Sequence, residues 1–237
     1  MDRKLYVVVM AAGSGTRMGS SVPKQFMNLG GRPVLARTVE LFARTCPEAR
    51  IVTVLPKDSI SYWDEWCLTH GFHIPQILVE GGITRFHSVR NALEKIPDGA
   101  VVAVHDGVRP LISASLVRTM VSRMQSCRAL IPVVPMVDTL KILSRTPDGG
   151  LVTAEGVSID RSRVFGAQTP QMFLSEDLKA AYARPYDTSF TDDASVAAAN
   201  GIPLSYIEGE RYNIKLTTPD DLSMAEAILE TMSGKNV

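Results

Sequence analysis

The chain has little cysteine and no excess of charge of either sign. Its 237 residues include three cysteines, and Lys+Arg and Asp+Glu number 25 each. This balance, without a basic tract, excludes a protein that binds nucleic acid through an electrostatic surface. Cys46, Cys67 and Cys127 lie far apart without C-x-x-C spacing. That spacing argues against a disulfide framework or a zinc site, and it favours buried free thiols in a reducing cytoplasm.

Long apolar runs are also missing. The run that starts at Leu5 ends after six residues at Met10, too short for the core of a signal peptide or for a membrane span. We therefore expect a cytoplasmic protein that does not enter a membrane. A hydrophobic content of 45% with 21% charged residues is typical of a globular protein, and the length suits one large α/β unit. We predict a single domain over residues 1–237.

Short Val/Ile-rich runs alternate with stretches of helical periodicity. The runs predict strands at residues 5–10, 50–55, 76–79, 100–105 and 128–134. Several are continuously apolar, as in strands that are covered on both faces. Helices are predicted at 34–45 with Pro33 near the start, at 84–96, after Ser113 and after Thr218. This alternation predicts an α/β fold with a mostly parallel sheet and helices on both sides.

Residues 136–157 interrupt the alternation. Two short apolar stretches flank the turn residues Pro147, Asp148 and Gly149, which predicts a β-hairpin inserted into the α/β chain. A lone hairpin is marginally stable in water. We therefore expect this arm to pack on a second subunit, the alternative being a hairpin folded back on its own domain.

The most informative stretch is 10–25, a glycine-rich loop directly after the first predicted strand. Gly13, Gly15 and Gly19 are spaced one residue too widely for a dinucleotide fingerprint, and none precedes a lysine as in a P-loop. Glycines let backbone N–H groups approach a polyanion, and Arg17 and Lys24 add positive charge. We predict a phosphate-binding loop; the alternative is an ordinary strand–helix turn with incidental cations.

A second candidate motif follows the third predicted strand. Gly81 and Gly82 would let the backbone approach a flat ligand, and Ser88 offers a hydroxyl in the next helical turn. Arg85 would add charge at the same place. A plain turn with a helix cap explains the glycines equally well.

The fourth predicted strand leads into Asp106, at the sheet edge where α/β proteins bind ligands. A carboxylate beside phosphates needs Mg²⁺ or a hydroxyl donor as its partner. The alternative is a structural pair between Asp106 and Arg109. For the preceding His105 we expect a structural or ligand-orienting role.

Two polar residues stand near the C-terminal part of the chain. Thr191 precedes a short helical segment and is either a ligand contact or the N-cap of that helix. Lys215 lies in a predicted short strand at 213–217, just before the last helix, and is a candidate phosphate contact.

Taken in order, these motifs resemble the 2-C-methyl-D-erythritol 4-phosphate cytidylyltransferases. The matching segments span residues 10–222 and read AAGSGTRMG, PKQF, GG-x-x-R-x-x-SV, VHDGVRP, DTLK, DR…QTPQ-x-F, TDDAS and NIKLTTPDDL. The resemblance implies a Rossmann-like three-layer nucleotidyltransferase fold, with the hairpin as a dimerisation arm. It also implies a reaction of CTP with 2-C-methyl-D-erythritol 4-phosphate that yields CDP-methylerythritol and pyrophosphate. In such phosphoryl transfer the attacking oxygen is already ionised, so no general base is needed.

The resemblance further implies the residues of the site. The catalytic residues would be Arg17, Lys24, Arg161 and Lys215. The nucleotide would contact Ala11, Ala12, Gly13, Ser14, Gly15, Gly82, Arg85, Ser88, Asp106 and Gly107. The polyol phosphate would contact Asp106, Arg109, Thr139, Arg161, Thr169, Thr191 and Lys215. Mg²⁺ would be bound mainly by the CTP phosphates, with Asp106 as the protein group nearest to it.

Two alternatives to this function remain. A cytidylyltransferase for ribitol 5-phosphate or another polyol phosphate would share the fold, CTP and the arm. A non-catalytic nucleotide-binding scaffold would be expected to have lost Arg17, Lys24 or Lys215, and all three are present. The chain also departs from many members of the family at Ile83 and Thr84, where an acid or another polar residue is common near the base.

Overall fold

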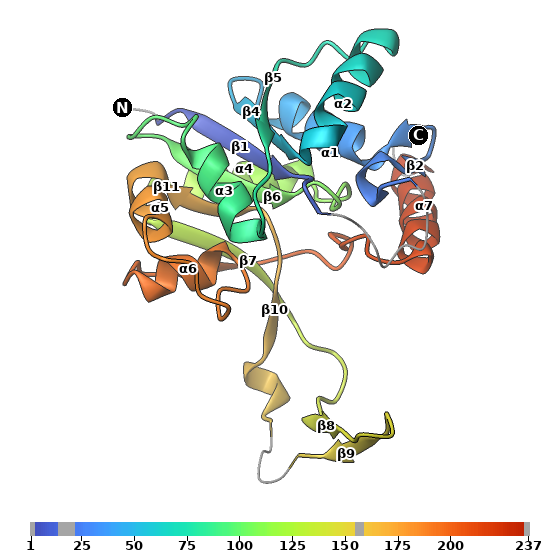
Figure 1. Ribbon diagram of the computed structural model, residues 1–237, viewed down its shortest axis with the longest axis vertical. Helices are drawn as coiled ribbons and strands as arrows, with labels where there is room; N and C mark the ends of the chain where they lie inside the picture. Colours follow the sequence, from blue (N-terminus) through green and yellow to red (C-terminus); the bar gives the residue numbers. More distant parts are fainter. Residues whose placement is uncertain (1–2, 14–21, 155–158, 235–237) are drawn as a thin grey trace.

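The computed structural model describes residues 3–13, 22–154 and 159–234, and an eight-stranded mixed sheet forms its centre (Figure 1). The strand order is β10-β7-β11-β6-β1-β4-β5, with β12 paired to β7. The strands are β1 (Leu5–Met10), β4 (Arg50–Leu55), β5 (Gln76–Glu80), β6 (Val101–Asp106), β7 (Ala129–Pro135), β10 (Phe165–Ala167), β11 (Gln171–Leu174) and β12 (Ser205–Glu208). Pairs among β6, β1, β4 and β5 are parallel, whereas β10 and β11 run antiparallel to their neighbours.

Helices cover both faces of this sheet, and β1 shows how the core divides. Tyr6, Val8 and Met10 belong to a cluster with α3, α5 and α6, whereas Leu5, Val7 and Val9 face α1, α2 and α4. Successive strand residues point to opposite faces, so a continuous apolar strand supplies both cores. The helices are α1 (Val34–Thr45), α2 (Lys57–Thr69), α3 (Arg85–Leu93), α4 (Ala114–Arg123), α5 (Ser175–Tyr182), α6 (Asp193–Ala199) and α7 (Pro219–Gly234). The predicted α/β fold with a mostly parallel sheet is confirmed.

Most predicted elements occur where the patterns place them. The predicted strands at 5–10 and 50–55 coincide with β1 and β4. The predicted strand at 76–79 ends one residue before β5 does, and those at 100–105 and 128–134 are displaced by one residue from β6 and β7. The predicted helix at 34–45 coincides with α1, although Pro33 is its N-cap rather than its first residue. The helix predicted at 84–96 is shorter, because Thr84 caps it and it ends at Leu93.

The strand predicted at 213–217 is wrong. Among the described residues this segment has no ladder partner. Its backbone makes a turn bond from Asn213 N to Glu210 O and a longer-range bond from Leu216 N to Val108 O. The Asn213 side chain donates to the Thr169 carbonyl at 2.8 Å, so side-chain contacts replace the ladder. An irregular backbone here positions Lys215 individually instead of in an alternating strand pattern.

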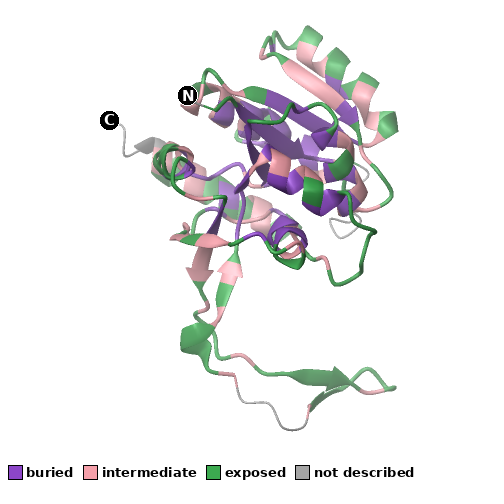
Figure 2. Cartoon of the chain, turned by 90° about the vertical axis from the view of Figure 1, so that its left-hand side faces the viewer, coloured by how far each residue is buried: buried purple, intermediate pink, exposed green. Residues whose placement is uncertain are grey.

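The predicted hairpin is present as an arm that extends away from the sheet (Figures 1 and 2). Strands β8 (Leu143–Arg145) and β9 (Leu151–Thr153) pair antiparallel, with Leu143 opposite Thr153. The turn is closed by a bond from Thr146 N to Gly150 O. Residues 155–157 of the predicted arm lie outside the described residues. Apolar side chains on this arm are exposed, including Val137, Ile142, Leu143, Leu151 and Val152.

Two small features complete the described chain. Strands β2 (Asn28–Leu29) and β3 (Arg32–Pro33) form a short hairpin between the 3-10 helix η2 (Lys24–Phe26) and α1. A second 3-10 helix, η3 (Arg161–Arg163), lies at the base of the arm.

None of the helices in the described ranges combines the length and apolar character needed to cross a membrane. The cysteines are unpaired, as predicted, but half-buried rather than buried.

Candidate active site

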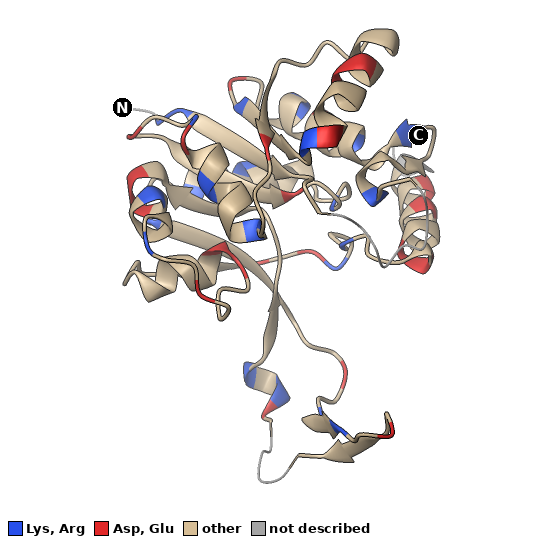
Figure 3. Ribbon diagram, in the orientation of Figure 1, with Lys and Arg blue, Asp and Glu red and all other residues tan. Residues whose placement is uncertain are grey.

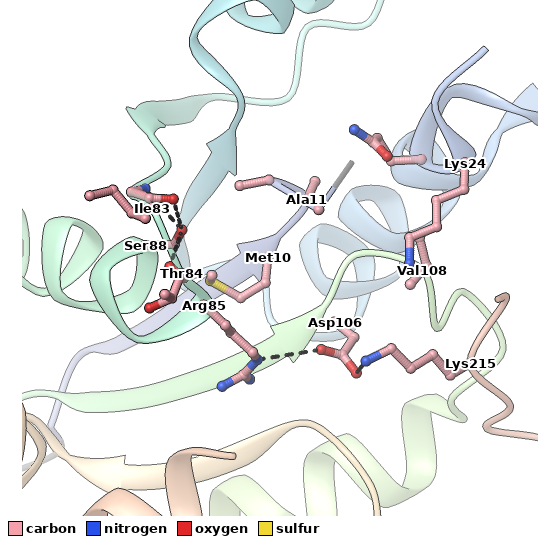
Figure 4. A pocket seen from close by; sticks show the side chains of 14 residues that line it. Met10, Ala11, Lys24, Ile83, Thr84, Arg85, Ser88, Asp106, Val108 and Lys215 are labelled. Carbon is pink, nitrogen blue, oxygen red and sulfur yellow. Dashed lines mark hydrogen bonds and ion pairs between the residues drawn. The ribbon is translucent and has the colours of Figure 1, made fainter. Parts of the chain in front are cut away.

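A cavity of about 400 Å³ lies at the carboxyl ends of β1, β5 and β6 (Figure 4). Parallel strands bring the residues that follow them to one sheet edge, so three motifs distant in sequence meet here. Nine predicted site residues line this cavity: Ala11, Ala12, Gly13, Lys24, Gly82, Arg85, Ser88, Asp106 and Lys215. The arrangement unites the described ends of the stretch 10–25, the Gly81–Gly82 motif and Asp106 in one pocket.

One wall of the cavity is made of closely packed backbone. A Cβ on Gly81 would lie 2.5 Å from the Cβ of Ala12, and a Cβ on Gly82 would lie 2.5 Å from that of His87. Ser88 Oγ accepts a hydrogen bond from Gly82 N at 2.9 Å and donates one to Thr84 O at 3.0 Å. Only glycine fits at these two positions without a shift of Ala12 or His87, so the backbone here is open to close approach by a ligand.

Asp106, the last residue of β6, sits among three cations. Its Oδ2 lies 3.2 Å from Arg109 Nε and 3.1 Å from Lys215 Nζ, and its Oδ1 lies 4.0 Å from Arg85 Nε. Burial alone would raise the pKa of this carboxyl, but Arg85, Lys215 and Arg109 together hold the pKa well below its usual range. The carboxylate therefore stays ionised, and the three cations leave a surplus of positive charge for a polyanion.

The backbone behind Asp106 is fixed by a small polar network. Asp106 N donates to Thr169 Oγ1 at 3.0 Å, and the fully buried His105 places Nδ1 3.2 Å from the same hydroxyl and Nε2 3.0 Å from Arg109 O. Burial lowers the pKa of His105 to about 4, so the ring is neutral at neutral pH. These contacts fit the structural role predicted for His105 and place Thr169 behind the cavity, against its backbone.

Two lysines reach the cavity from separate elements (Figure 4). Lys24 comes from η2, whose Phe26 packs on Tyr62 and Trp63 of α2 with ring centroids 4.9 and 6.0 Å apart. Lys215 comes from the irregular segment before α7 and points at Asp106. Packing of the aromatic side chains thus fixes the short helix that carries one of the two cations.

Arg85 is engaged elsewhere although it lines the cavity. Its two terminal nitrogens donate to the Asp193 carboxylate at 2.8 and 2.6 Å. Arg85 lies beside the cavity, as predicted. Its shortest hydrogen bonds are with Asp193 of α6, so its terminal nitrogens point away from the cavity.

Other predicted site residues lie outside the cavity lining. Arg109 bridges Asp106 and the Asn213 carbonyl, and the Gly107 carbonyl accepts from the Thr38 hydroxyl at 3.0 Å. Ser14, Gly15 and Arg17 fall outside the described residues. The alternative of Thr191 as the helix cap is wrong: Asp192 caps α6, in a capping box with Ser195, because its carboxylate accepts from Ser195 N at 2.8 Å.

Thr139 of the arm and Arg161 of the adjacent η3 segment lie outside the cavity lining of their own chain. Both are exposed, and Arg161 Nη1 donates to Val137 O at 2.6 Å. The segment η3, which carries Arg161 and Arg163, forms a patch of positive charge on the arm (Figure 3). A single chain therefore does not bring the arm cations to Asp106.

The cavity also contains residues that the sequence motifs did not indicate as part of the site. Gln25, 1% exposed, lines the pocket, and neither polar atom of its amide has a hydrogen-bond partner among the described residues. Its position next to Lys24 within the PKQF segment was the signal that could have identified it. Ile83 lines the rim and is 97% exposed. In the described ranges no group of three or more His, Cys, Asp or Glu side chains is arranged to hold a metal ion.

The fold and the cavity define a class of protein. Glycines, cations and a carboxylate at the carboxyl edge of a largely parallel sheet are typical of α/β enzymes that bind nucleotides.

Comparison with known proteins identifies the family within that class. The sequence model of the family described as IspD, 2-C-methyl-D-erythritol 4-phosphate cytidylyltransferase, matches residues 5–231. Relatives with that name from Porphyromonas gingivalis strain W83 and Bacteroides fragilis are 44% and 42% identical, covering 97% and 94% of this chain and 99% and 98% of their own lengths. The chain belongs to this cytidylyltransferase family.

Solved structures agree with this assignment. The cytidylyltransferase from Thermus thermophilus has a TM-score of 0.69 at 30% identity, covering 96% of this chain and 98% of that one. The 4-diphosphocytidyl-2C-methyl-D-erythritol synthase from Anaerococcus prevotii has a TM-score of 0.77 at 26% identity, covering 97% and 100%. The three-layer nucleotidyltransferase fold expected from the resemblance is thereby confirmed.

Proposed function

We propose that this chain transfers CMP from CTP to 2-C-methyl-D-erythritol 4-phosphate, which releases pyrophosphate and forms CDP-methylerythritol. Membership of the family supports the reaction class. The observation that carries the proposal is the cavity itself, in which Lys24 and Lys215 face a glycine-lined wall across Asp106. Such a pocket offers exposed backbone for a base and concentrated positive charge for phosphates.

The reaction joins two anions, so its barrier is mainly electrostatic. An oxygen of the polyol phosphate attacks the α-phosphorus of CTP, a new P–O bond forms, and the bond to the β-phosphate breaks. Catalysis of this type depends on positioning and on charge stabilisation rather than on covalent groups of the protein. Lys24 and Lys215 line the cavity from opposite elements, and we assign them the stabilisation of the charge that develops at the α-phosphorus. We assign Arg17, from the glycine-rich loop, to the same task.

The backbone wall and Asp106 would orient the nucleotide. Gly82 N already donates to Ser88 Oγ, so the carbonyls and hydroxyl of this wall are held in place for a base. We assign Ala11, Ala12 and Gly13 to contacts with the nucleotide, because they line the same pocket. The remaining predicted contacts, Ser14, Gly15 and Gly107, stay part of this proposal.

The donor set fits Mg²⁺ bound chiefly by the triphosphate. Asp106 provides one ionised carboxylate at the cavity, and Mg²⁺ commonly takes one or two carboxylates plus phosphate oxygens. Bound there, Mg²⁺ would neutralise phosphate charge and help pyrophosphate depart. Asp106 is the residue of this chain that would approach the metal.

We further propose a homodimer in which the arm, residues 136–157, reaches the partner's cavity. The arm exposes apolar side chains, and the adjacent η3 segment carries Arg161 outside its own cavity. In a dimer Thr139 and Arg161 would bind the polyol phosphate beside the partner copy's Asp106, Arg109, Thr169, Thr191 and Lys215. The chain would act as one catalytic domain, and its unpaired thiols together with the use of CTP favour the cytoplasm.

The first test is pyrophosphate release from CTP and Mg²⁺ with 2-C-methyl-D-erythritol 4-phosphate, run beside D-ribitol 5-phosphate. We expect release with the methylerythritol substrate. Release with ribitol phosphate alone would reassign the substrate while keeping the reaction class. Normal CTP binding by Arg17→Ala and Lys24→Ala variants, together with no pyrophosphate under any condition, would contradict an enzymatic role.

A mixing experiment tests the shared site. Arg161→Ala subunits lack the cation that would enter the partner's cavity, and Lys24→Ala subunits lack one cation of their own cavity. When the two are mixed, some heterodimers contain one intact site, so we expect activity to recover well above that of either variant alone. Confirmed exchange of subunits without recovery would rule out a site that is completed by the partner's arm.

A further inference from the structure

Asp193, the first residue of α6, is a buried charge that the reaction as proposed leaves unexplained. Its side chain is 0% exposed, and it accepts from both terminal nitrogens of Arg85 at 2.8 and 2.6 Å. The Tyr182 hydroxyl also donates to it, at 2.5 Å. Burial of an ion pair costs desolvation that its attraction often only balances, so stability alone is a weak reason for this pair.

The start of α6 is held by other contacts. Asp192 and Ser195 form the capping box, and Gln171 donates to the Asp192 carboxylate and accepts from Ala194 N, both at 2.8 Å. The helix is therefore anchored without the charge of Asp193. This leaves the orientation of Arg85 as the distinctive effect of that carboxylate.

The orientation of Arg85 decides which oxygen of Asp106 stays accessible. Because both terminal nitrogens are on Asp193, only Nε of Arg85 faces Asp106 Oδ1, at 4.0 Å, which is beyond hydrogen-bond distance. The contacts from Arg109 and Lys215 both end on Oδ2. Figure 4 shows Arg85 and Lys215 approaching the carboxylate from opposite sides.

We infer that Asp193 is a positioning residue that holds the guanidinium of Arg85 away from Asp106, so that Oδ1 of Asp106 remains an acceptor for a hydroxyl group of the bound nucleotide. Without Asp193, the unsatisfied donors of Arg85 would turn to Asp106, the other carboxylate in its reach. The inference rests on the proposed function, since it assumes that the cavity binds CTP. It extends that function to a residue outside the cavity lining.

The test compares Asp193→Asn with Asp177→Asn in the full chain. Asp177 of α5 makes the same kind of two-nitrogen pair with Arg128, outside the cavity lining, and is the matched control. We measure kcat and KM for both substrates, and the affinity for CTP by calorimetry without the polyol phosphate. For Asp193→Asn we expect about a tenfold or greater loss of kcat/KM and weaker CTP binding, as when an outer partner of a site is removed. The control should retain both values.

The direction in which Asp193→Asn changes the CTP affinity distinguishes a positioning role from a purely Coulombic effect of the lost charge. Removal of a negative charge near a polyanion should tighten CTP binding if only Coulomb attraction matters. Weaker binding supports the inference, whereas unchanged or tighter binding by folded Asp193→Asn overturns it. A lower melting temperature with unchanged kinetics would also overturn it, since the pair would then be structural.

Tyr182→Phe provides a second route if Asp193→Asn does not fold. This variant removes one hydrogen bond to Asp193 and keeps its charge. We expect a smaller loss of CTP affinity, about twofold to fivefold, in the same direction. An unchanged affinity would count against the inference. Wild-type protein that binds CTP but turns over neither polyol phosphate would overturn the proposed function and leave the CTP comparison valid.

Discussion

At the scale of single residues, electrostatics dominates the candidate site. Asp106 makes its closest contacts with Lys215 and Arg109. The guanidinium of Arg85 lies farther from Asp106, because its terminal nitrogens bind the Asp193 carboxylate. The motifs predicted these cations near phosphates, but not the way they share one carboxylate. In the chain without ligand, Asp106 keeps the cations in place; with CTP bound, phosphate oxygens would compete for them.

We expect Lys215→Ala to lower kcat by about a hundredfold to a thousandfold, the usual cost of losing one group that stabilises a transition state. Pyrophosphate release measures the effect. Lys179→Ala is the matched control, because Lys179 pairs with Asp98 outside the cavity lining and should keep normal kcat. Equal activity of the two variants would show that Lys215 has no part in catalysis.

At the scale of elements, the helix caps follow from local sequence, whereas the packing of the arm does not. Helix caps are local, so Ser113 before α4 was predictable from the residue type and is observed to accept from Leu116 N at 3.0 Å. Element α2 and strands β11 and β12 escaped prediction because their sequences lack a regular apolar period or are very short. The arm was predictable as a hairpin from its turn residues. The surface on which the arm packs depends on contacts between subunits, which no local pattern records.

Ser113→Ala should lower the free energy of unfolding by about 1–2 kcal/mol, because the helix loses its cap. The hydroxyl also donates to Glu210, whose carboxylate would lose a partner. Denaturant unfolding measures the change. Ser115→Ala, at an exposed position inside the same helix, should leave stability nearly unchanged or slightly higher. A similar result for both substitutions would show that the cap contributes little.

The exposed apolar face of the arm supports a second prediction at this scale. We expect Leu143→Lys combined with Leu151→Lys to yield a monomer with strongly reduced turnover, because these exposed side chains share one face of the hairpin and two charges would have to be buried in the dimer interface. Sedimentation velocity and pyrophosphate release report the two effects. Leu68→Lys on α2, where the leucine is 71% exposed, should change neither. A dimer that survives the double substitution would place the interface elsewhere.

At the scale of the whole molecule, one buried histidine makes stability depend on pH. His105 has a pKa of about 4 in the folded protein, because burial disfavours its charged form, against 6.5 when unfolded. As pH falls from 7 to 5, the unfolded chain gains a proton that the folded chain does not, so stability decreases. The expected loss from this group is about 2 kcal/mol over that interval.

Denaturant unfolding of wild type and His105→Asn at pH 7 and pH 5 tests this coupling. The variant loses native contacts and should be less stable at pH 7, but its stability should fall less between the two pH values. His73→Gln, at an exposed position, should lose as much unfolding free energy between pH 7 and pH 5 as the wild type. The same slope for His105→Asn would show that another group is responsible.

The sequence alone determined the α/β alternation with β1, β4, β5, β6 and β7, the arm as a hairpin, and the motifs that line the cavity. It did so because apolar periodicity, turn residues and glycine spacing are local properties of the chain. Only the tertiary structure decided that Lys215 lies on an irregular segment and that Asp193 holds Arg85. Those features depend on contacts between residues as much as 108 positions apart. No local pattern records such a contact, because it arises when the sheet brings distant strand ends to one edge.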